Sequence, residues 1–226
     1  MMQRVRLAFL NFGYGQLTMG GLAKACDLTA RALYYHFKSK EDAFRESIRW
    51  NHIGEIQRGW DAGRRKLARG GSAVEVIVAI LDARFGETRR DLALSPHASE
   101  LNFEAFHRCM DIIAQSAVVF QAGLAEVLAD LEKRHLIQLR PNQTPADAAQ
   151  LLADGARGVN QTLPNLPAAT LPERYARMCD ALLYGITEPA AKASRQAAAR
   201  GDAPTDRASA ESLLTSEKRA SADGRR

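Results

Sequence analysis

The sequence has few of the features that mark secreted, membrane-spanning or metal-binding proteins. Its three cysteines, Cys26, Cys109 and Cys179, lie far apart and form no C-x-x-C pair, so neither a disulfide framework nor a zinc module is indicated. The longest mostly apolar run, CMDIIAQSAVVF, is interrupted by Asp111 and Gln115 and is shorter than the roughly 20 residues that span a bilayer. No small-residue cleavage site follows the basic N-terminus. We therefore expect a cytoplasmic protein with no membrane partner.

Aromatic residues and runs of β-branched residues are also scarce. Aromatic residues make up 7% of the 226 residues, whereas alanine and leucine, which favour helices, are abundant. The chain is 46% apolar and 25% charged, which is enough to bury a core in one large or two small domains. These features predict an all-α protein.

Positive charge is concentrated at the N-terminal end. Residues 1–70 hold 13 Lys and Arg against 6 acidic residues, residues 71–187 hold 10 against 14, and residues 188–226 hold 8 against 6. A basic end joined to an acidic body is expected of a nucleic-acid-binding segment attached to a body with another role.

Helix starts can be located from Ser or Thr residues that are followed three positions later by an acid. Such capping boxes occur at Ser39–Asp42, Ser72–Glu75, Thr144–Asp147 and Thr170–Glu173. Residues 96–136 are long enough to predict two helices, with a break that the pattern does not locate. After Ile186 large apolar residues almost disappear, so we expect residues 188–226 to form a disordered tail.

Three short helices are predicted near the N-terminus. The first ends at Gly13, the second covers residues 19–25 behind a cap at Thr18, and the third begins after a cap at Thr29. Two short helices joined by a three-residue turn match the helix-turn-helix, whose second helix enters the major groove of DNA.

The residues of this segment resemble a known DNA-binding domain. The pattern includes Phe9, Gly13-Tyr14, Leu17-Thr18-Met19 and the run LYYHFKSKE at residues 33–41. It is similar to the DNA-binding domain of the TetR family of bacterial transcriptional regulators over about the first 50 residues. The resemblance implies an N-terminal domain at residues 1–50 with its helix-turn-helix at about 18–37. A helical effector-binding and dimerisation domain at residues 51–187 would follow.

The third helix is expected to read bases at its start and to hold phosphates at its end. Arg31 can donate two hydrogen bonds to guanine, which is worth roughly 1–3 kcal/mol of discrimination. Lys40 lies at the next helix N-terminus, which attracts phosphate. For Tyr34 the alternative to phosphate contact is packing in the core, and for His36 the alternative is capping of the helix. The expected DNA-binding residues are Arg4, Thr18, Thr29, Ala30, Arg31, Ala32, Tyr34, Tyr35, His36 and Lys40.

The rest of the chain is expected to provide a dimer interface and an effector pocket. The resemblance implies a homodimer through helices at about 145–160 and 171–187, where Ala148, Leu151, Leu152, Gly155 and Val159 form one seam; intramolecular core is the alternative. It also implies a pocket for a small-molecule effector of unknown identity between residues 73 and 136. Candidate lining residues, which ordinary core packing explains equally well, are Phe85, Phe103, Phe106, Met110, Ile113 and Phe120.

A stripe of polar residues follows one side of the predicted helix after Ser95. His97, Glu100, Glu104, His107 and Asp111 share a sector of about 80°, and Glu104-x-x-His107 has the spacing of carboxylate-bridged metal sites in helical bundles. A solvated helix face is the better interpretation, so we expect no metal site and no cofactor.

Three classes of function remain. The leading hypothesis is a transcriptional regulator of the repressor type, whose dimer binds a palindromic operator and is released by a small molecule. An enzyme is disfavoured because the sequence has no nucleophile elbow and no Gly-rich phosphate loop. The remaining alternative is a helical module that binds a small molecule or a protein with weakened DNA binding, because Gly20 and Gly21 leave the second helix without long polar side chains.

Overall fold

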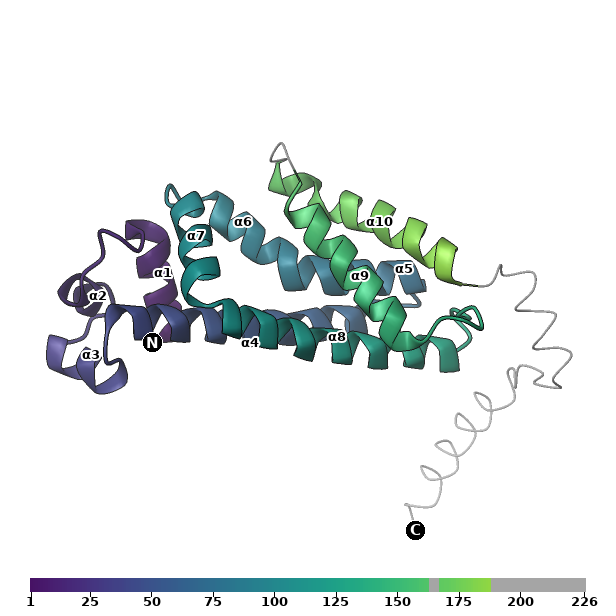
Figure 1. Cartoon of the computed structure of the whole chain (residues 1–226), viewed down its shortest axis with the longest axis horizontal. Coiled ribbons are helices and arrows are strands. Elements are labelled where there is room, and N and C mark those ends of the chain that lie inside the picture. Colours follow the sequence, from purple (N-terminus) through teal and green to yellow (C-terminus); the bar gives the residue numbers. More distant parts are fainter. Residues whose placement is uncertain (163–166, 188–226) are drawn as a thin grey trace, which may run out of the picture. The chain divides into compact units, whose positions relative to one another are not determined.

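The computed structural model describes residues 1–162 and 167–187. Regular structure in these residues is helical, apart from an isolated antiparallel bridge between Leu139 and Thr187, which confirms the all-α fold class. A π-helical turn, η1 (Asp82–Gly86), joins α5 to α6, and a 3₁₀ turn, η2 (Ala168–Thr170), precedes α10. The helices in Figure 1 are α1 (Met2–Phe12), α2 (Met19–Ala25), α3 (Ala30–His36), α4 (Lys40–Ala68), α5 (Ala73–Leu81), α6 (Glu87–Ala93), α7 (Ala98–Arg108), α8 (Met110–Lys133), α9 (Pro145–Asn160) and α10 (Leu171–Ile186).

The first 50 residues, which we call the head, are built around a small apolar core. Phe9 of α1, Leu22 of α2 and Leu33 of α3 are each at most 2% exposed. The rings of Phe9 and Phe44 meet edge to face with centroids 4.9 Å apart. Figure 1 shows α1, α2 and α3 gathered at one end of the long helix α4. Leu33 is the buried residue of α3, so most of the surface of this helix is free for contacts outside the head.

The break that the sequence pattern did not locate lies at Cys109, between α7 and α8. Cys109 is completely buried, and together with Leu101 and Ile112 it completes the apolar core of the head. Burial raises the pKa of the Cys109 thiol to about 11, so this cysteine serves as a small apolar group. The α7–α8 junction is therefore packed directly against the head.

Residues 51–187, which we call the body, enclose a larger core. Helix α4 packs on α5 and α8, α9 packs on α8 and α10, and α10 packs on α5. The central side chains are almost fully buried: Ile77, Leu81, Leu124, Leu152 and Tyr175. These residues repeat at helical spacing, which is why each helix presents one apolar face to its neighbours.

The capping boxes are only partly as predicted. Ser72–Glu75 and Thr144–Asp147 form both reciprocal hydrogen bonds. The Ser39 hydroxyl accepts from the backbone N–H of Asp42, whose carboxylate accepts from the N–H of Lys38 instead of Ser39. Helix α10 begins directly after Thr170 as predicted, but the predicted cap was wrong, because the Thr170 hydroxyl donates to the carbonyl of Pro167.

Helix α8 is more apolar than the sequence interpretation allowed. Its 24 residues include an 18-residue window of mean hydropathy 1.6, so by length and composition alone it could cross a membrane. The estimate that the longest apolar run is too short for a span was therefore wrong for this helix. Phe120, Leu124 and Leu128 on one of its faces are buried in the body core, and 22% of that window is buried in all. The predicted disordered tail at residues 188–226 lies outside the described residues.

Candidate nucleic-acid interface

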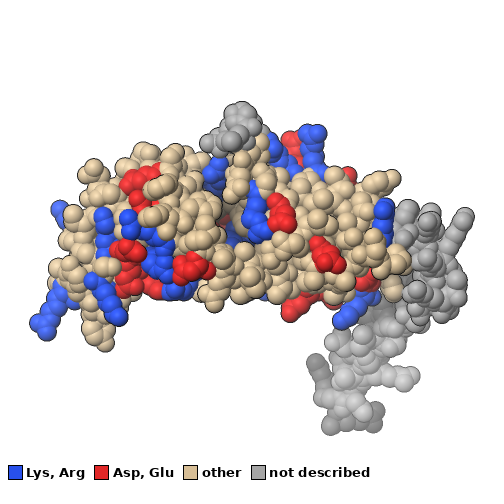
Figure 2. All heavy atoms as spheres, viewed as in Figure 1, with Lys and Arg blue, Asp and Glu red and all other residues tan. Residues whose placement is uncertain are grey.

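The outer side of α3 is exposed, as a groove-binding helix requires. Tyr34 is 55% and Tyr35 is 88% exposed, and the side chains of Arg31 and His36 also face solvent. The alternative of core packing for Tyr34 therefore does not describe this structure. Ala30 is exposed and Ala32 half-buried at the start of the helix. Figure 2 shows Lys and Arg side chains around this end of the protein, with acidic side chains between them.

Two threonines fix the helix-turn-helix by capping its helices. The Thr18 hydroxyl accepts from the backbone N–H of Gly21 at 3.1 Å, and the Thr29 hydroxyl accepts from that of Ala32 at 3.1 Å. Both side chains are exposed, so each hydroxyl proton remains free to donate to a phosphate. The sequence analysis predicted both caps and placed both residues at the interface, and the structure confirms the caps.

Arg4 holds the turn between α2 and α3. Its guanidinium donates to the carbonyl of Cys26 at 3.0 Å and lies 3.1 Å from the carboxylate of Asp27. Asp27 has a φ of 55°, in the left-handed region that Asp tolerates better than most residues. Arg4 was predicted to contact DNA, and the structure assigns its nearest hydrogen bonds to the protein instead.

The Lys40 side chain also makes its hydrogen bonds within the head. Its ammonium donates to the carbonyls of Tyr14 and Gly15 at 2.8 and 3.4 Å and lies 4.5 Å from the centre of the Tyr14 ring. These contacts tie the start of α4 to the loop after α1. Two of the three ammonium protons are used in this way, which leaves one for a phosphate.

Polar contacts that the sequence analysis missed join the head to the body. Arg45 donates two hydrogen bonds to the Asp111 carboxylate, at 3.0 and 2.6 Å. The backbone N–H of Gly15 donates to Glu100 at 2.6 Å, and Arg108 donates to Glu41 at 2.8 Å. Asp111 keeps 64% of its side chain exposed, as expected of a solvated face, whereas Glu100 and Glu104 of the same polar stripe are 35% and 17% exposed. The described residues contain no cluster of three or more His, Cys, Asp or Glu that could hold a metal ion.

The six candidate pocket residues do not line one cavity. Phe85 and Phe120 pack edge to face with centroids 5.5 Å apart, and Phe120 is stacked on Trp60. Phe103 and Met110 are 66% and 51% exposed. The other two, Phe106 and Ile113, line a cavity between the head and the body.

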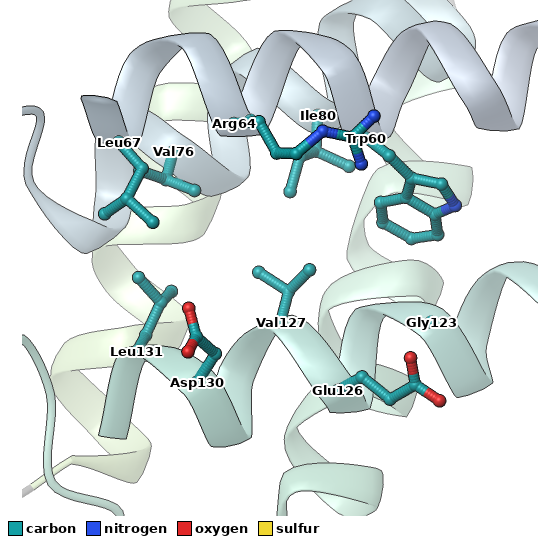
Figure 3. Close-up of a pocket in the computed structure, with 11 residues that line it drawn as sticks. Trp60, Arg64, Leu67, Val76, Ile80, Gly123, Glu126, Val127, Asp130 and Leu131 are labelled. Carbon is teal, nitrogen blue, oxygen red and sulfur yellow. The ribbon is translucent and has the colours of Figure 1, made fainter. Parts of the chain in front are cut away.

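A separate cavity of about 300 Å³ lies within the body, between α4, α5 and α8. Figure 3 shows its apolar side chains, among them Trp60, Ile80 and Val127, with the carboxylates of Glu126 and Asp130 along α8. A side chain at position 123 would collide with Trp60, because an added Cβ would lie 2.6 Å from the ring. Gly123 therefore lets the indole lie flat against α8. The sequence analysis proposed none of these residues.

A buried polar network occupies the centre of the protein. Arg84 of η1 and Glu55 of α4 form an ion pair whose side chains are 4% and 2% exposed. Burial alone would raise the pKa of Glu55, but the hydrogen bond from His52 and the charge of Arg84 outweigh it, so the pKa lies below its usual value. Burial lowers the pKa of Arg84. A sequence signal existed, since Arg84 continues the apolar stripe of Ile77 and Leu81.

Comparisons with known proteins agree with this geometry. Residues 8–46 match the family described as bacterial regulatory proteins, tetR family. The HTH-type transcriptional regulator AcrR of Shigella flexneri is 30% identical over 118 residues, which are 50% of this chain and 49% of that protein. The match therefore spans about half the length of this curated relative.

Solved structures share the fold over most of the described chain. SmeT, the repressor of the Stenotrophomonas maltophilia multidrug efflux pump SmeDEF, has a TM-score of 0.57 at 18% identity, covering 83% of this chain and 88% of that chain. FadR of Thermus thermophilus, a TetR-family repressor in complex with lauroyl-CoA, has a TM-score of 0.50 at 18% identity, covering 79% and 93%. At these identities the likeness shows the fold alone.

Proposed function

Because the chain belongs to the TetR family of bacterial regulatory proteins, we propose that it is a DNA-binding transcriptional regulator, a repressor that a small molecule releases from its operator. The observation that carries this proposal is the exposure of α3 along its outer side, from Arg31 to His36. Helix α3 buries Leu33 within the head and leaves the side chains of Arg31, Tyr34, Tyr35 and His36 exposed, an arrangement that suits a helix reading a DNA groove. It acts in the cytoplasm, where bacterial DNA lies.

Each exposed residue of α3 has a proposed role. Arg31 donates to a guanine edge in the major groove, and Ala30 or Ala32 meets a thymine methyl group. Tyr34, Tyr35 and His36 donate to phosphates, which set the register of the helix on the duplex. Thr18 and Thr29 use their free hydroxyl protons in the same way. Arg4 and Lys40 act mainly by holding the turn and the loop in place, as their hydrogen bonds inside the head indicate.

We also propose that two chains pair through α9 and α10. Leu151 and Tyr184 are 40% and 82% exposed, and an added Cβ at Gly158 or Gly185 would meet nothing within 4 Å. This combination of exposed apolar side chains and open backbone suits close approach of a second copy. A dimer places two copies of α3 on half-sites about one helical turn apart.

The predicted seam of α9 needs revision for this purpose. Ala148 and Leu152 are completely buried within the chain, and an added Cβ at Gly155 would lie 2.7 Å from the sulfur of Met178. These three residues therefore belong to the intramolecular core, which was the alternative. Leu151 is the member of the seam that remains available to a partner.

The effector is proposed to enter the body. The cavity of about 300 Å³ beside Trp60 lies at the lower end of the range for small-molecule sites and has mainly apolar walls. Helix α4 runs from this cavity into the head, so a ligand that displaces α4 can change the spacing of the two reading helices.

Selection of bound duplexes from a random DNA pool tests the proposed function. The expected result is a two-fold related site. Arg31→Ala should then relax the preference at a guanine position in each half-site, at a cost of about 1–3 kcal/mol for that base. The matched control is Arg69→Ala, which removes the same charge at the far end of α4 and should keep the selected sequence unchanged. Folded protein that recovers no two-fold site would contradict the proposal.

A further inference from the structure

A second cavity, of about 240 Å³, lies at the junction between the head and the body. Its walls come from α1 and the first half of α4 on one side, and from α6, α7 and the start of α8 on the other. It shares no lining residue with the body cavity beside Trp60. A ligand here would touch both parts of the protein at once.

The walls of this junction cavity are mostly apolar, with a few polar side chains among them. Phe9, Leu92 and Phe106 are among the apolar residues, and the polar ones include Arg6, Asn51 and Thr88. Arginine and histidine occur among the lining residues that the structure describes, whereas Asp and Glu do not. Arg6 and Asn51 donate to the carboxylates of Asp91 and Glu55 behind the wall, and they hold further N–H donors, so the cavity favours a ligand whose polar end accepts hydrogen bonds.

The polar end of the junction cavity is the outer layer of the buried network. Asn51 donates to Glu55 at 2.6 Å, the His52 ring lies 3.1 Å from the same carboxylate, and Thr88 also donates to it. Behind them Arg84 donates to Glu55 and to Ser116, while its Nε is buried and has no hydrogen-bond partner among the described residues. The carboxylate of Glu55 is therefore saturated with donors, and the network has a donor in excess.

We propose that the junction cavity binds a small amphipathic monocarboxylate, whose apolar part packs against Phe9 and Phe106 and whose carboxylate faces the Asn51, His52 and Arg6 side chains. The size fits this class of ligand. A cavity of 150 Å³ holds benzene, so about 240 Å³ has room for one ring and a carboxylate. A long acyl chain or a fused polycyclic compound exceeds this space.

Because the cavity lies between the head and the body, a ligand bound in it can change the orientation of the head. Besides the continuous helix α4, the head is tied to the body by short hydrogen bonds around the cavity. Arg6 donates to Asp91 at 2.8 Å, and the Ser95 hydroxyl donates to the carbonyl of Leu10 at 2.6 Å. A ligand that separates the two walls must lengthen these bonds, so its binding favours a different orientation of the head. This coupling to DNA rests on the proposed function, whereas the binding site itself does not.

Binding is tested on the full chain without DNA. The probes are benzoate, benzyl alcohol and benzylamine, titrated by calorimetry, with amide shifts in NMR spectra to locate the site. We expect benzoate to bind more tightly than benzyl alcohol, and benzylamine to bind least. Shifts should centre on residues such as Ala105 and Thr88. Absence of benzoate binding, equal binding of benzylamine, or shifts centred on Trp60 and Val127 would each overturn the proposal.

Two phenylalanines of α7 provide a matched pair of variants. Phe106 lines the cavity and is 48% exposed, whereas Phe103 is 66% exposed and stacks on His107 outside it. Both can be truncated with little loss of core packing. Phe106→Ala should weaken benzoate binding about tenfold because part of a buried phenyl contact is lost. Phe103→Ala should leave it unchanged, and an equal loss in both variants would contradict the assignment.

Coupling is tested on the operator duplex obtained by selection. Benzoate should reduce the affinity of the wild type for this duplex, and Phe106→Ala should require about tenfold more benzoate for the same effect. Benzoate that binds in the cavity but leaves DNA affinity unchanged would overturn the coupling. If selection recovers no operator while benzoate still binds, the proposed function fails and the site stands. If an operator is found and benzoate does not bind, the proposed ligand site is refuted while the proposed function is supported.

Discussion

Removing only one charge of the Glu55–Arg84 ion pair should lower the free energy of unfolding more than removing both charges. Glu55→Gln leaves the guanidinium of Arg84 without a countercharge, at a position where its side chain is 4% exposed. An uncompensated buried charge of this kind costs about 3–5 kcal/mol. For a chain of this size each kcal/mol corresponds to about 2–4 °C in Tm, so the expected loss is roughly 6–20 °C.

The double variant Glu55→Gln/Arg84→Met is the matched control. It removes both charges and leaves the space occupied, so it should be more stable than Glu55→Gln alone. Thermal and urea unfolding followed by far-UV circular dichroism, at one protein concentration and pH 7, measures these differences. A loss below about 1 kcal/mol in Glu55→Gln, or a double variant whose loss equals the sum of the two single variants, would refute the reasoning.

Two further predictions concern stability. His135 follows α8 with a φ of 58°, so His135→Gly should raise the free energy of unfolding by about 1 kcal/mol and His135→Val should lower it, as measured by calorimetry. The pKa of Glu55 is lower in the folded protein than in the unfolded chain, so its contribution is present above the unfolded value of about 4.3 and is lost as the pH falls through the folded value. The wild type should therefore lose stability more steeply than Glu55→Gln on acidification below about pH 4.3, and parallel curves would count against this.

The parts of the fold that depend on local chemistry were predictable from the sequence. Caps at Thr18 and Thr29 are local signals, and the helices behind them begin where expected. The exposure of Tyr35 followed because Leu33 and Phe37 already supply the buried side of that segment. The cap predicted at Thr170 failed because the hydroxyl bonds to a preceding carbonyl, a competition that the spacing of residues does not reveal.

The parts that depend on distant partners were not predictable in this way. Lys40 bonds to the carbonyl of Tyr14, which lies 26 residues earlier in the chain. Asp111 belongs to a polar helix face, and a helical pattern does not distinguish water from an arginine of another helix as its partner. The junction cavity is formed by five helices, so its residues share no pattern in the sequence. Tertiary packing therefore decides which candidates meet at a site.

Methylation interference on the selected duplex tests most directly whether α3 reads the major groove. Methyl groups on guanine N7 occupy the position where we propose that the Arg31 guanidinium donates. The account predicts that methylation of a guanine in each of two half-sites, about one helical turn apart, blocks binding, and that Arg31→Ala abolishes this block. Binding that is indifferent to major-groove methylation throughout the protected site would contradict the account.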